Sequence, residues 1–474
     1  MKKHRTMWRI LCVIIAILYF SICVQATQIQ NNSEQDTVFQ EEENIGIDAT
    51  TTLLGVEKLV DNVQSAVLFE ANSNTLMYTW KADAKMRPAS FVKILTALIA
   101  VEEGNLSDVV TVSESAVSSV PHGAVSADLQ AGEQLTLEDL LYCMMVGSAN
   151  DAAAVIAEHL SGGQAAFVQK MNDYAQGIGC TNTQFTNPHG LHDDQQFTTA
   201  RDAARILAAA VKNEAFFTIF TAKQHTVAAT NKSDLRSMQT GNFLVDPTSK
   251  LYYDARVLGG RTGVTEDGKR CLASVADHNG MRLICVVMGT ESEYQEDGYS
   301  AISIGGYKET TALLDAGSNG FKTAQIIYEN QALRQITVAS GDSDVIVGPQ
   351  TSVITILPEN VSSENLTFRY SDLPLQAPVQ AGQKVSHLQV WNGNMCVAQA
   401  DLYAMNSVGQ INDLLVLQNS GNGNRIVTTI LLVAVCIACV AFVALFAVRG
   451  VGKLKMFIAN RRKNRYHRSH RRSR

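Results

Sequence analysis

The chain has 474 residues, of which 46% are hydrophobic and 18% are charged, and its formal net charge is −6. This length exceeds one ordinary domain and allows two sizeable hydrophobic cores. Setting aside the four cationic residues of Met1–Arg9 and the eleven of Arg449–Arg474 leaves a net charge of about −21 between them. That balance favours solubility of the intervening region and argues against nucleic acid as its partner.

The N-terminal segment has the features of a secretory signal peptide. After the cationic residues, Ile10 to Val24 is nearly all apolar, and Val24-Gln25-Ala26 offers small residues for cleavage. Cys23 raises the alternative of lipidation, but the three residues before it make a poor lipobox. We therefore expect a signal peptide over residues 1–26, followed by a polar, disordered spacer over 27–55.

The C-terminal region is typical of a single membrane span. An uncharged apolar run extends over residues 426–448 and is long enough for a transmembrane helix, preceded by a linker over 418–425. The tail, 449–474, is basic and has no acidic residue, so the positive-inside rule places it in the cytoplasm and the preceding chain outside. Nucleic-acid binding by the tail is an alternative, but membrane orientation and anionic lipids explain its charge more simply. We expect a single-pass protein of the cell membrane.

The first half of the intervening region predicts one hairpin and four helices. The strand-like runs SAVLFE and TLMYTW flank an Asn-rich turn within residues 64–80. A helix is expected over Pro88–Glu103, with proline early and Gly104 after its end. The remaining helices are expected from Thr136 to about Val146, opening with the capping sequence TLED, over Asp151–Leu160, and over Ala200–Lys212.

The pattern that follows indicates an α/β fold. Arg270–Ala276 and Met281–Met288 flank Asn279-Gly280, a strong hairpin signal, and Tyr307–Asp315 has the pattern of a helix. Strands at both ends with helices between them predict an antiparallel sheet that the N- and C-terminal segments share and that helices flank. We assign this domain to residues 56–322.

A second, smaller domain is expected over residues 323–417. Short β runs dominate there, with turn residues at regular spacing, which is typical of a small all-β, sandwich-like domain. The segment contains no cluster of histidines, cysteines and carboxylates, so we interpret it as a spacer or docking surface.

The cysteines of the exported region do not indicate a metal site or a disulfide framework. Their number is odd and their spacings fit neither arrangement. We expect most of them to be buried small hydrophobic residues, and we expect no metal or other cofactor. They are Cys143, Cys180, Cys271, Cys285 and Cys396.

The first catalytic candidate is the pair Ser90 and Lys93 in RPASFVKILTALIA. Three residues apart at the start of a helix, both side chains project from one face, and the helix dipole favours negative charge near the serine. A lysine in a desolvated cleft loses its proton near neutral pH and can then deprotonate the serine. A solvated helix surface is the alternative, which the apolar residues Ile94, Leu95, Leu98 and Ile99 weaken.

The second candidate is Ser148-Ala149-Asn150, at an interruption between two helical stretches. Ser148 could pass a proton between Lys93 and a leaving group, and the Asn150 amide could hold a substrate carbonyl. Simple N-capping of the helix that begins at Asp151 is the alternative, and Asn150 could do both.

The third candidate is LGGRTGVT. Glycine is used where backbone must approach something closely, and a cation with a hydroxyl at the same place suggests an anion. Arg261 and Thr262 are the anion-binding candidates, while Gly259, Gly260 and Gly263 would let substrate backbone approach. Taken alone, the stretch also fits an ordinary surface turn.

In this order and at these intervals, PASFVK, GSAN and GRTGVT resemble the Ser-x-x-Lys, Ser-x-Asn and Lys-Thr-Gly boxes of the penicillin-binding protein and serine β-lactamase superfamily. The resemblance is closest to the secreted D-alanyl-D-alanine carboxypeptidases of low molecular mass. It extends to MMVGSANDAAAVIAEHL, to FTNPHGLHDDQQFTTARDAARI and to LPLQAPVQAGQKVSHLQV in the β domain, and covers roughly residues 64–448.

The resemblance implies a mechanism. Ser90 would attack the carbonyl between the two terminal D-alanines of a peptidoglycan stem peptide, with Lys93 as general base and Ser148 as proton shuttle. The backbone N–H groups of Ser90 and Val264 would form the oxyanion hole, and Asn150, Arg261, Thr262 and Gly263 would bind the substrate. D-alanine would be released, and water would resolve the acyl-enzyme. By the same chemistry β-lactams would acylate Ser90.

Two positions depart from the family pattern. Arg261 stands where lysine is usual; it keeps the charge and offers a planar fork to a carboxylate, but cannot relay a proton. Gln196 precedes FTTA where histidine is frequent, so a supporting contact is expected to differ. For His189, in NPHGL, a structural turn role and a catalytic role are both open.

Two alternative functions follow from the same motifs. A class A β-lactamase shares the fold and the boxes but deacylates through a dedicated glutamate, and residues 185–202 contain none. The additional β domain and the membrane span also argue against it. The other alternative is a catalytically weak cell-wall-binding protein, which only the two departures support.

Overall fold

A computed structural model describes residues 57–296 and 301–411, together with 47, 49, 52–55, 433–435, 437 and 440. The predicted signal peptide, linker and basic tail lie outside the described residues, as do most of the spacer and of the apolar run 426–448. Among the residues that the structure describes, no helix is both long and apolar enough to cross a membrane. The chain divides after Phe321 into two compact units, each with a core of its own.

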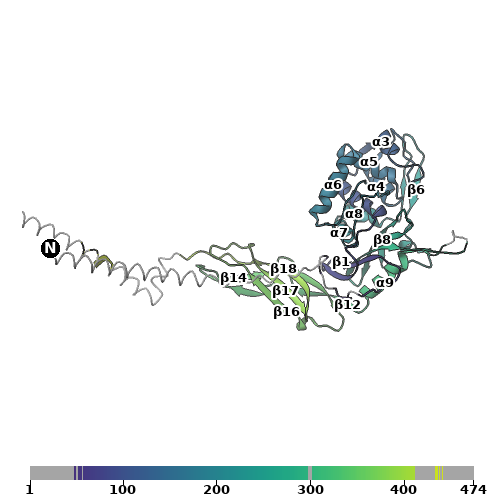
Figure 1. The fold of residues 1–474 in the computed structure, drawn as a ribbon. Coiled ribbons are helices and arrows are strands. Elements are labelled where there is room, and N and C mark those ends of the chain that lie inside the picture. Colours follow the sequence, from purple (N-terminus) through teal and green to yellow (C-terminus); the bar gives the residue numbers. More distant parts are fainter. Residues whose placement is uncertain are drawn as a thin grey trace, which may run out of the picture. The chain divides into compact units, whose positions relative to one another are not determined.

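The first unit is built on a five-stranded antiparallel sheet of order β2-β1-β9-β8-β7 (Figure 1). The N-terminal hairpin lies beside strands from the end of the unit, which confirms the expectation that both segments share one sheet. The strands are β1 (Ser65–Glu70), β2 (Thr75–Trp80), β7 (Val257–Val264), β8 (Arg270–His278) and β9 (Met281–Thr290).

The predicted hairpin at Asn279-Gly280 is confirmed. His278 and Met281 pair across it, and both turn residues have positive φ, 49° and 80°, as a two-residue turn of this kind requires. β7 pairs with β8 and ends the strand order, so among the described strands it is an edge of the sheet.

The predicted helices are all observed, and their ends lie within a few residues of the expected ones. Thr136 and Thr199 cap two of them by accepting a hydrogen bond from the backbone N–H groups of Asp139 and Asp202. A short 3-10 turn, η2 (Ala89–Phe91), precedes α2. The predicted helices are observed as α2 (Val92–Glu103), α4 (Leu137–Met145), α5 (Asn150–Ser161), α7 (Ala200–Ala210) and α9 (Tyr307–Ser318).

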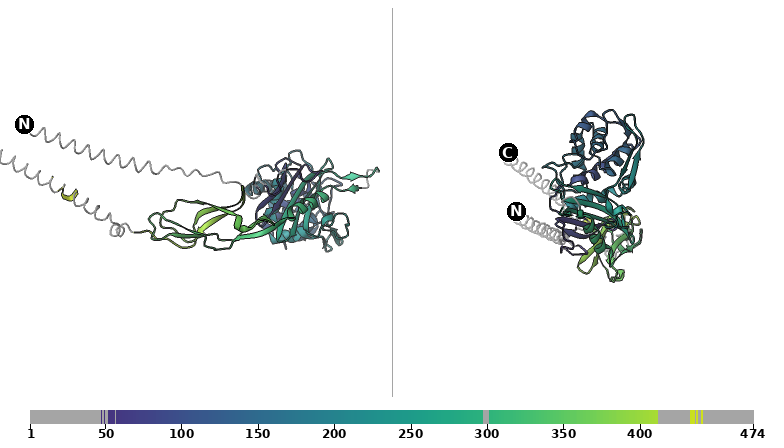
Figure 2. Two further views of the ribbon diagram at one scale, coloured as in Figure 1. Left: turned by 90° about the horizontal axis from the view of Figure 1, so that it is seen from below. Right: turned by 90° about the vertical axis from the view of Figure 1, so that its right-hand side faces the viewer.

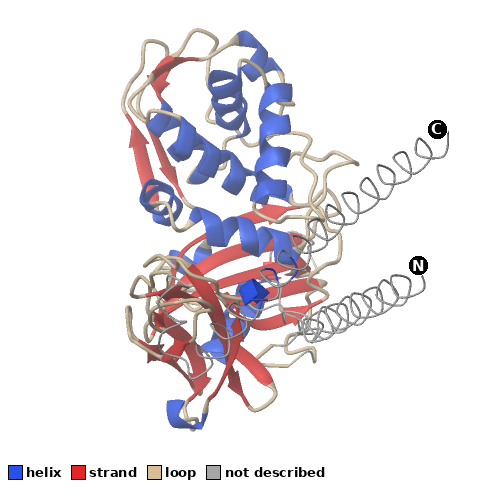
Figure 3. Ribbon diagram, turned by 90° about the vertical axis from the view of Figure 1, so that its left-hand side faces the viewer, coloured by secondary structure: helices blue, strands red, loops and turns tan. Residues whose placement is uncertain are grey.

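Several further elements, among them the 14-residue helix α6 (Gln164–Gly177), had no distinct sequence signal. They are the helices α3 (Glu114–Ser118), α6 (Gln164–Gly177), α8 (Glu214–Thr221) and η3 (Phe243–Val245), with the strand pairs β3 (Val109–Thr111) and β4 (Gln134–Thr136), β5 (Gln224–Val227) and β6 (Arg236–Gln239), and β10 (Glu293–Tyr294) and β11 (Ala301–Ser303). Figure 3 shows most of the helices of this unit gathered beside its sheet.

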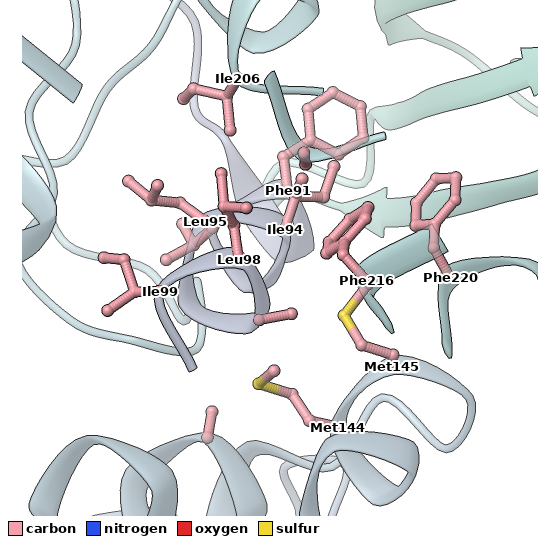
Figure 4. Packing of buried hydrophobic residues seen from close by; sticks show 14 of the residues in the cluster. Phe91, Ile94, Leu95, Leu98, Ile99, Met144, Met145, Ile206, Phe216 and Phe220 are labelled. Carbon is pink, nitrogen blue, oxygen red and sulfur yellow. The ribbon is translucent and has the colours of Figure 1, made fainter. Parts of the chain in front are cut away.

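Helix α2 runs through the centre of the first unit. All residues from Val92 to Ala100 are buried, so the helix is apolar almost all round, as a helix surrounded by others must be. Figure 4 shows Ile94, Leu98 and their neighbours packed among Met144 and Met145 of α4 and Phe216 and Phe220 of α8. The only charged residue in this buried stretch is Lys93, with no exposed surface.

Helices cover the sheet on both faces. Val67 and Phe69 of β1 belong to the core that contains α2 and α7, whereas Leu68, between them, faces α9, where a Cβ at Gly317 would lie 2.3 Å from it. This is the alternation expected of a strand. It explains why all six residues of β1 are buried.

The second unit is an all-β domain, as expected (Figure 2). A five-stranded sheet of order β13-β14-β18-β17-β16 and the pair β12-β15 contribute to one hydrophobic core. Its elements are β12 (Phe321–Ile327), β13 (Arg334–Ile336), β14 (Val345–Gly348), β15 (Val353–Pro358), η4 (Ser363–Asn365), β16 (Thr367–Asp372), β17 (Lys384–Asn392) and β18 (Met395–Ala404). The five cysteines of the two units are all buried, where most of them were expected to be.

Candidate active site

A cavity of about 510 Å³ lies where the helices of the first unit meet the edge strand β7. It brings together the three sequence motifs, which are far apart along the chain. Its walls come from η2, the segment 123–125, the break between α4 and α5, the loop 190–196 and the end of β7. Of the predicted site residues, Ser90, Ser148, Asn150, Thr262, Gly263 and Val264 line it; Lys93 and Arg261 lie behind the wall.

Ser90 is held in the cavity wall by unusual backbone. Ala89, immediately before it, has φ of +46°, in the left-handed region that non-glycine residues rarely adopt. Gly190, with φ of +87°, packs directly on this turn: a Cβ there would lie 1.9 Å from the carbonyl oxygen of Ala89. Strained residues of this kind persist where the surrounding structure holds them, and they gather at functional sites.

Lys93 lies on the buried side of Ser90. Its Nζ is 3.4 Å from Ser90 Oγ and donates hydrogen bonds to Asn150 Oδ1 at 2.7 Å and to the carbonyl oxygen of His189 at 2.5 Å. Burial, and then the positive charge of Arg261, hold the pKa of Lys93 well below that of an exposed lysine, while Asp151 acts in the opposite direction.

These contacts suit Lys93 to act as a base. A neutral amine has two N–H groups and one lone pair, and the oxygens of Asn150 and His189 accept the two N–H groups. The lone pair is then left for the hydroxyl of Ser90, which donates to it in that state. The geometry can therefore move a proton from Ser90 Oγ to Lys93 Nζ.

Ser148 and Asn150 occupy the break between α4 and α5. Ser148 has φ of +64°, a second left-handed residue at the site. Asn150 is the first residue of α5, and its Nδ2 donates to the carbonyl oxygen of Val125 at 2.8 Å. N-capping by Asn150, the alternative role, is not observed, because Ala149 occupies the cap position and makes no side-chain capping bond. The Asn150 side chain instead joins Lys93 to a wall of the cavity.

Arg261 is only 5% exposed and binds the protein itself. It donates to Ser148 Oγ, to the carbonyl oxygen of Met145 at 2.9 Å and to that of Ser90 at 3.4 Å. Burial lowers its pKa to about 10, so it stays charged at neutral pH. Its charge therefore lies directly behind the cavity, while Thr262, the next residue of β7, lines it.

The glycines of β7 have different roles. A Cβ at Gly263 would lie 3.0 Å from the Cβ of Ala89 and 3.1 Å from the backbone nitrogen of Ser90, so glycine here lets β7 approach the serine turn. The expectation that Gly259 and Gly260 admit substrate is wrong. Their Cβ positions are filled by protein, since Gly259 packs on the carbonyl oxygen of Phe220 and Gly260 on Asn242.

The loop 185–199 forms the remaining wall. His189 is 6% exposed, and burial with the nearby Lys93 charge lowers its pKa to about 3, so its ring is neutral and accepts a bond from the Leu191 N–H. Gln196 bonds within the loop, to Thr186 and Leu191. At the cavity mouth, His192 Nε2 lies 2.9 Å from Glu266 Oε2.

Three groups near the site were not identified from the sequence. The carbonyl oxygens of His189 and Val125 hold Lys93 and Asn150, but a backbone acceptor leaves no trace in residue type. Asp151, a buried carboxylate directly after the Ser-x-Asn motif, does have a signal, since an acidic residue is unusual in an otherwise apolar helical stretch.

Comparison with known proteins identifies the family to which the chain is similar. Residues 56–292 match the family model described as D-alanyl-D-alanine carboxypeptidase, and residues 321–410 match that of the penicillin-binding protein 5 C-terminal domain. The chain is 30% identical over 373 residues to D-alanyl-D-alanine carboxypeptidase DacA of Haemophilus influenzae, covering 77% of this chain and 90% of the relative. It is 29% identical over 357 residues to DacF of Bacillus subtilis, covering 73% and 86%.

A solved structure shares the architecture of both units. Penicillin-binding protein 5 of Haemophilus influenzae superimposes with a TM-score of 0.63 at 30% identity, over 75% of this chain and 100% of that chain.

Proposed function

The chain belongs to the D-alanyl-D-alanine carboxypeptidase family of penicillin-binding proteins and has the serine peptidase activity of that family, and we propose that substrates of this protein acylate Ser90. The observation that carries this proposal is the buried amine of Lys93, 3.4 Å from Ser90 Oγ, with its other hydrogen-bonding directions already used. A lysine placed in this way activates a serine without any other base.

In the proposed reaction, Lys93 takes the proton of Ser90 as Oγ attacks the carbonyl carbon between the two terminal D-alanines of a stem peptide. The backbone N–H groups of Ser90 and Val264 stabilise the oxyanion. The carbon–nitrogen bond then breaks, and the departing D-alanine amine takes a proton from Lys93 through Ser148. Water hydrolyses the ester and returns Ser90 to its free form.

We propose that two residues of β7 divide recognition of the terminal carboxylate. Thr262 lines the cavity and makes the direct contact, whereas Arg261 acts from behind through its charge and its bond to Ser148. Asn150 lines the cavity too, and one hydrogen of its amide is available to the substrate after the bond to Val125.

The test is D-alanine release from a pentapeptide ending in D-Ala-D-Ala, measured beside penicillin hydrolysis by the same purified protein. We expect D-alanine release, stable labelling by a fluorescent penicillin and slow penicillin turnover. Fast penicillin hydrolysis would indicate a class A-like β-lactamase, and loss of both reactions a cell-wall-binding protein. Ser90→Ala should abolish labelling and release, with Ser118→Ala, an exposed serine of α3, as the matched control. Labelling that persists in Ser90→Ala would contradict the assignment.

We further propose that the protein is exported by residues 1–26 and anchored by residues 426–448, with the active site outside the cell membrane and the basic tail inside. The charge-free apolar run and the eleven cations after it support this proposal. In membrane fractions the full chain should require detergent for release, whereas a chain ending at Ile411 should not. Added protease should reach the first unit in intact spheroplasts but not the tail.

A further inference from the structure

Asp151 is a buried carboxylate, 2% exposed, that the proposed reaction does not use. It accepts four hydrogen bonds, and no ion pair of the described part of the chain includes it. The donors are Ser126 Oγ at 2.6 Å and the backbone N–H groups of Ala127 at 3.0 Å, Leu129 at 3.0 Å and Ala152 at 2.9 Å.

Three of these four donors belong to segment 125–129, whose first residue lines the cavity. Val125 lines the cavity, and its carbonyl oxygen accepts from both the backbone nitrogen of Asn150, at 2.9 Å, and Nδ2 of the same residue, at 2.8 Å. Asp128, within the segment, has φ of +55°, so its backbone needs support. Segment 125–129 and the first two residues of α5 therefore form reciprocal hydrogen bonds, since each side both donates and accepts.

Segment 125–129 affects Lys93 through the orientation of the Asn150 amide. With Nδ2 bonded to Val125, the opposite end of the amide, Oδ1, faces Lys93 Nζ at 2.7 Å. If the segment shifted, the amide would lose the contact that determines which of its ends points at the lysine. A continuous set of bonds thus connects Asp151 to the amine beside Ser90.

We propose that Asp151 is a positioning residue for acyl transfer at Ser90. Its carboxylate holds segment 125–129, which fixes Asn150 against Lys93 and keeps the cavity wall in place. The inference rests on the proposed function, in which Lys93 accepts the Ser90 proton.

The charge of Asp151 provides a measurable signature. The groups that face Lys93 are Arg261 from β7, Asp151 from α5 and His189, uncharged, from the loop. Burial and Arg261 lower the pKa of Lys93, and Asp151 raises it. Removing the Asp151 charge therefore lowers that pKa further, and the acidic limb of a pH–rate profile should move to lower pH.

The experiment compares purified full-length variants in acylation by a fluorescent penicillin, across pH. Asp151→Asn keeps the volume but loses the charge and acceptors; we expect the second-order acylation constant to fall about tenfold or more, with the acidic limb at lower pH. The matched control is Asp202→Asn, because Asp202 of α7 is also 2% exposed, bonds to Asn182 and Thr183, and does not line the cavity. Its limb should stay at the wild-type position.

The outcomes separate the two proposals. Wild-type protein that is neither acylated nor active would overturn the proposed function. Two outcomes would overturn only the role of Asp151 while the wild type is active. In one, the Asp151→Asn variant is acylated as fast as the wild type. In the other, it is acylated more slowly but the acidic limb of its pH–rate profile does not move. If circular dichroism shows that Asp151→Asn is unfolded, Ser126→Ala keeps the charge and removes one donor. It should lower acylation about threefold with an unmoved limb, and a wild-type rate would contradict the proposal.

Discussion

The Nζ of Lys93 lies 3.4 Å from the Oγ of Ser90, on the buried side of the residue that faces the cavity. The lysine has no exposed surface, and its two strongest contacts are neutral oxygens. Neither contact supplies a negative charge to hold its proton. The reactive state of the site therefore depends on the amine remaining uncharged until the serine transfers its proton.

Lys93→Arg tests whether that amine acts as a base. Arginine keeps a cation near Ser90 but cannot deprotonate in a protein. Acylation by a fluorescent penicillin should fall by roughly 100- to 10,000-fold, the range for loss of a general base. Lys170→Arg, at a surface lysine paired with Glu103, is the control. Acylation of Lys93→Arg at the wild-type rate would rule out the base assignment.

The charge of Arg261 should influence the pH of the acidic limb, below which acylation slows. Because its positive charge lowers the pKa of Lys93, Arg261→Met should raise that pKa and move the acidic limb to higher pH. The same change removes the contact to Ser148. Arg261→Lys keeps the charge, so its limb should remain near the wild-type position. The measurement is the pH–rate profile of kcat/KM for D-alanine release by Arg261→Met and by Arg261→Lys. Acidic limbs at the same pH in the two variants would contradict the electrostatic role.

Gly263→Ala should block the approach of β7 to the serine turn. The new Cβ would lie 3.1 Å from the backbone nitrogen of Ser90, a proposed oxyanion donor. Acylation should fall by about 100-fold, comparable to losing such a donor, with a smaller effect on stability. Gly177→Ala is the control, because apart from its chain neighbours and the backbone of its own helix nothing lies within 4 Å of the added Cβ. Equal acylation rates in the two variants would show that the close approach is unimportant.

His189 should make the first unit sensitive to acid. Its pKa is about 3 in the native state against 6.5 ordinarily, so as pH falls below 6.5 the unfolded chain binds this proton first. The free energy of unfolding should therefore fall by up to about 1.4 kcal/mol per pH unit from this group between pH 6.5 and 3. Urea unfolding of His189→Gln should show a shallower decrease, while exposed His122→Gln should follow wild type. Parallel curves for wild type and His189→Gln would exclude this contribution.

Local patterns predicted much of the fold. The Asn279-Gly280 turn, the cap at Thr136 and the apolar run of α2 depend on neighbours in sequence, so the residues alone indicate them. The elements without a distinct pattern, such as α6 and the β5–β6 pair, were not predicted, because tertiary packing stabilises them.

The sequence by itself determined which side chains bring chemistry to this protein: a serine and a lysine one helical turn apart, a Ser-x-Asn break and a Gly-rich strand with one arginine. It could not determine what each polar group bonds to. The tertiary structure decided that Arg261 lies behind the cavity, that Gly259 and Gly260 face protein, and that carbonyl oxygens of remote loops hold Lys93 and Asn150. The physical reason is that hydrogen bonding and burial depend on distances between segments far apart in the chain, and every residue type offers the same backbone acceptor.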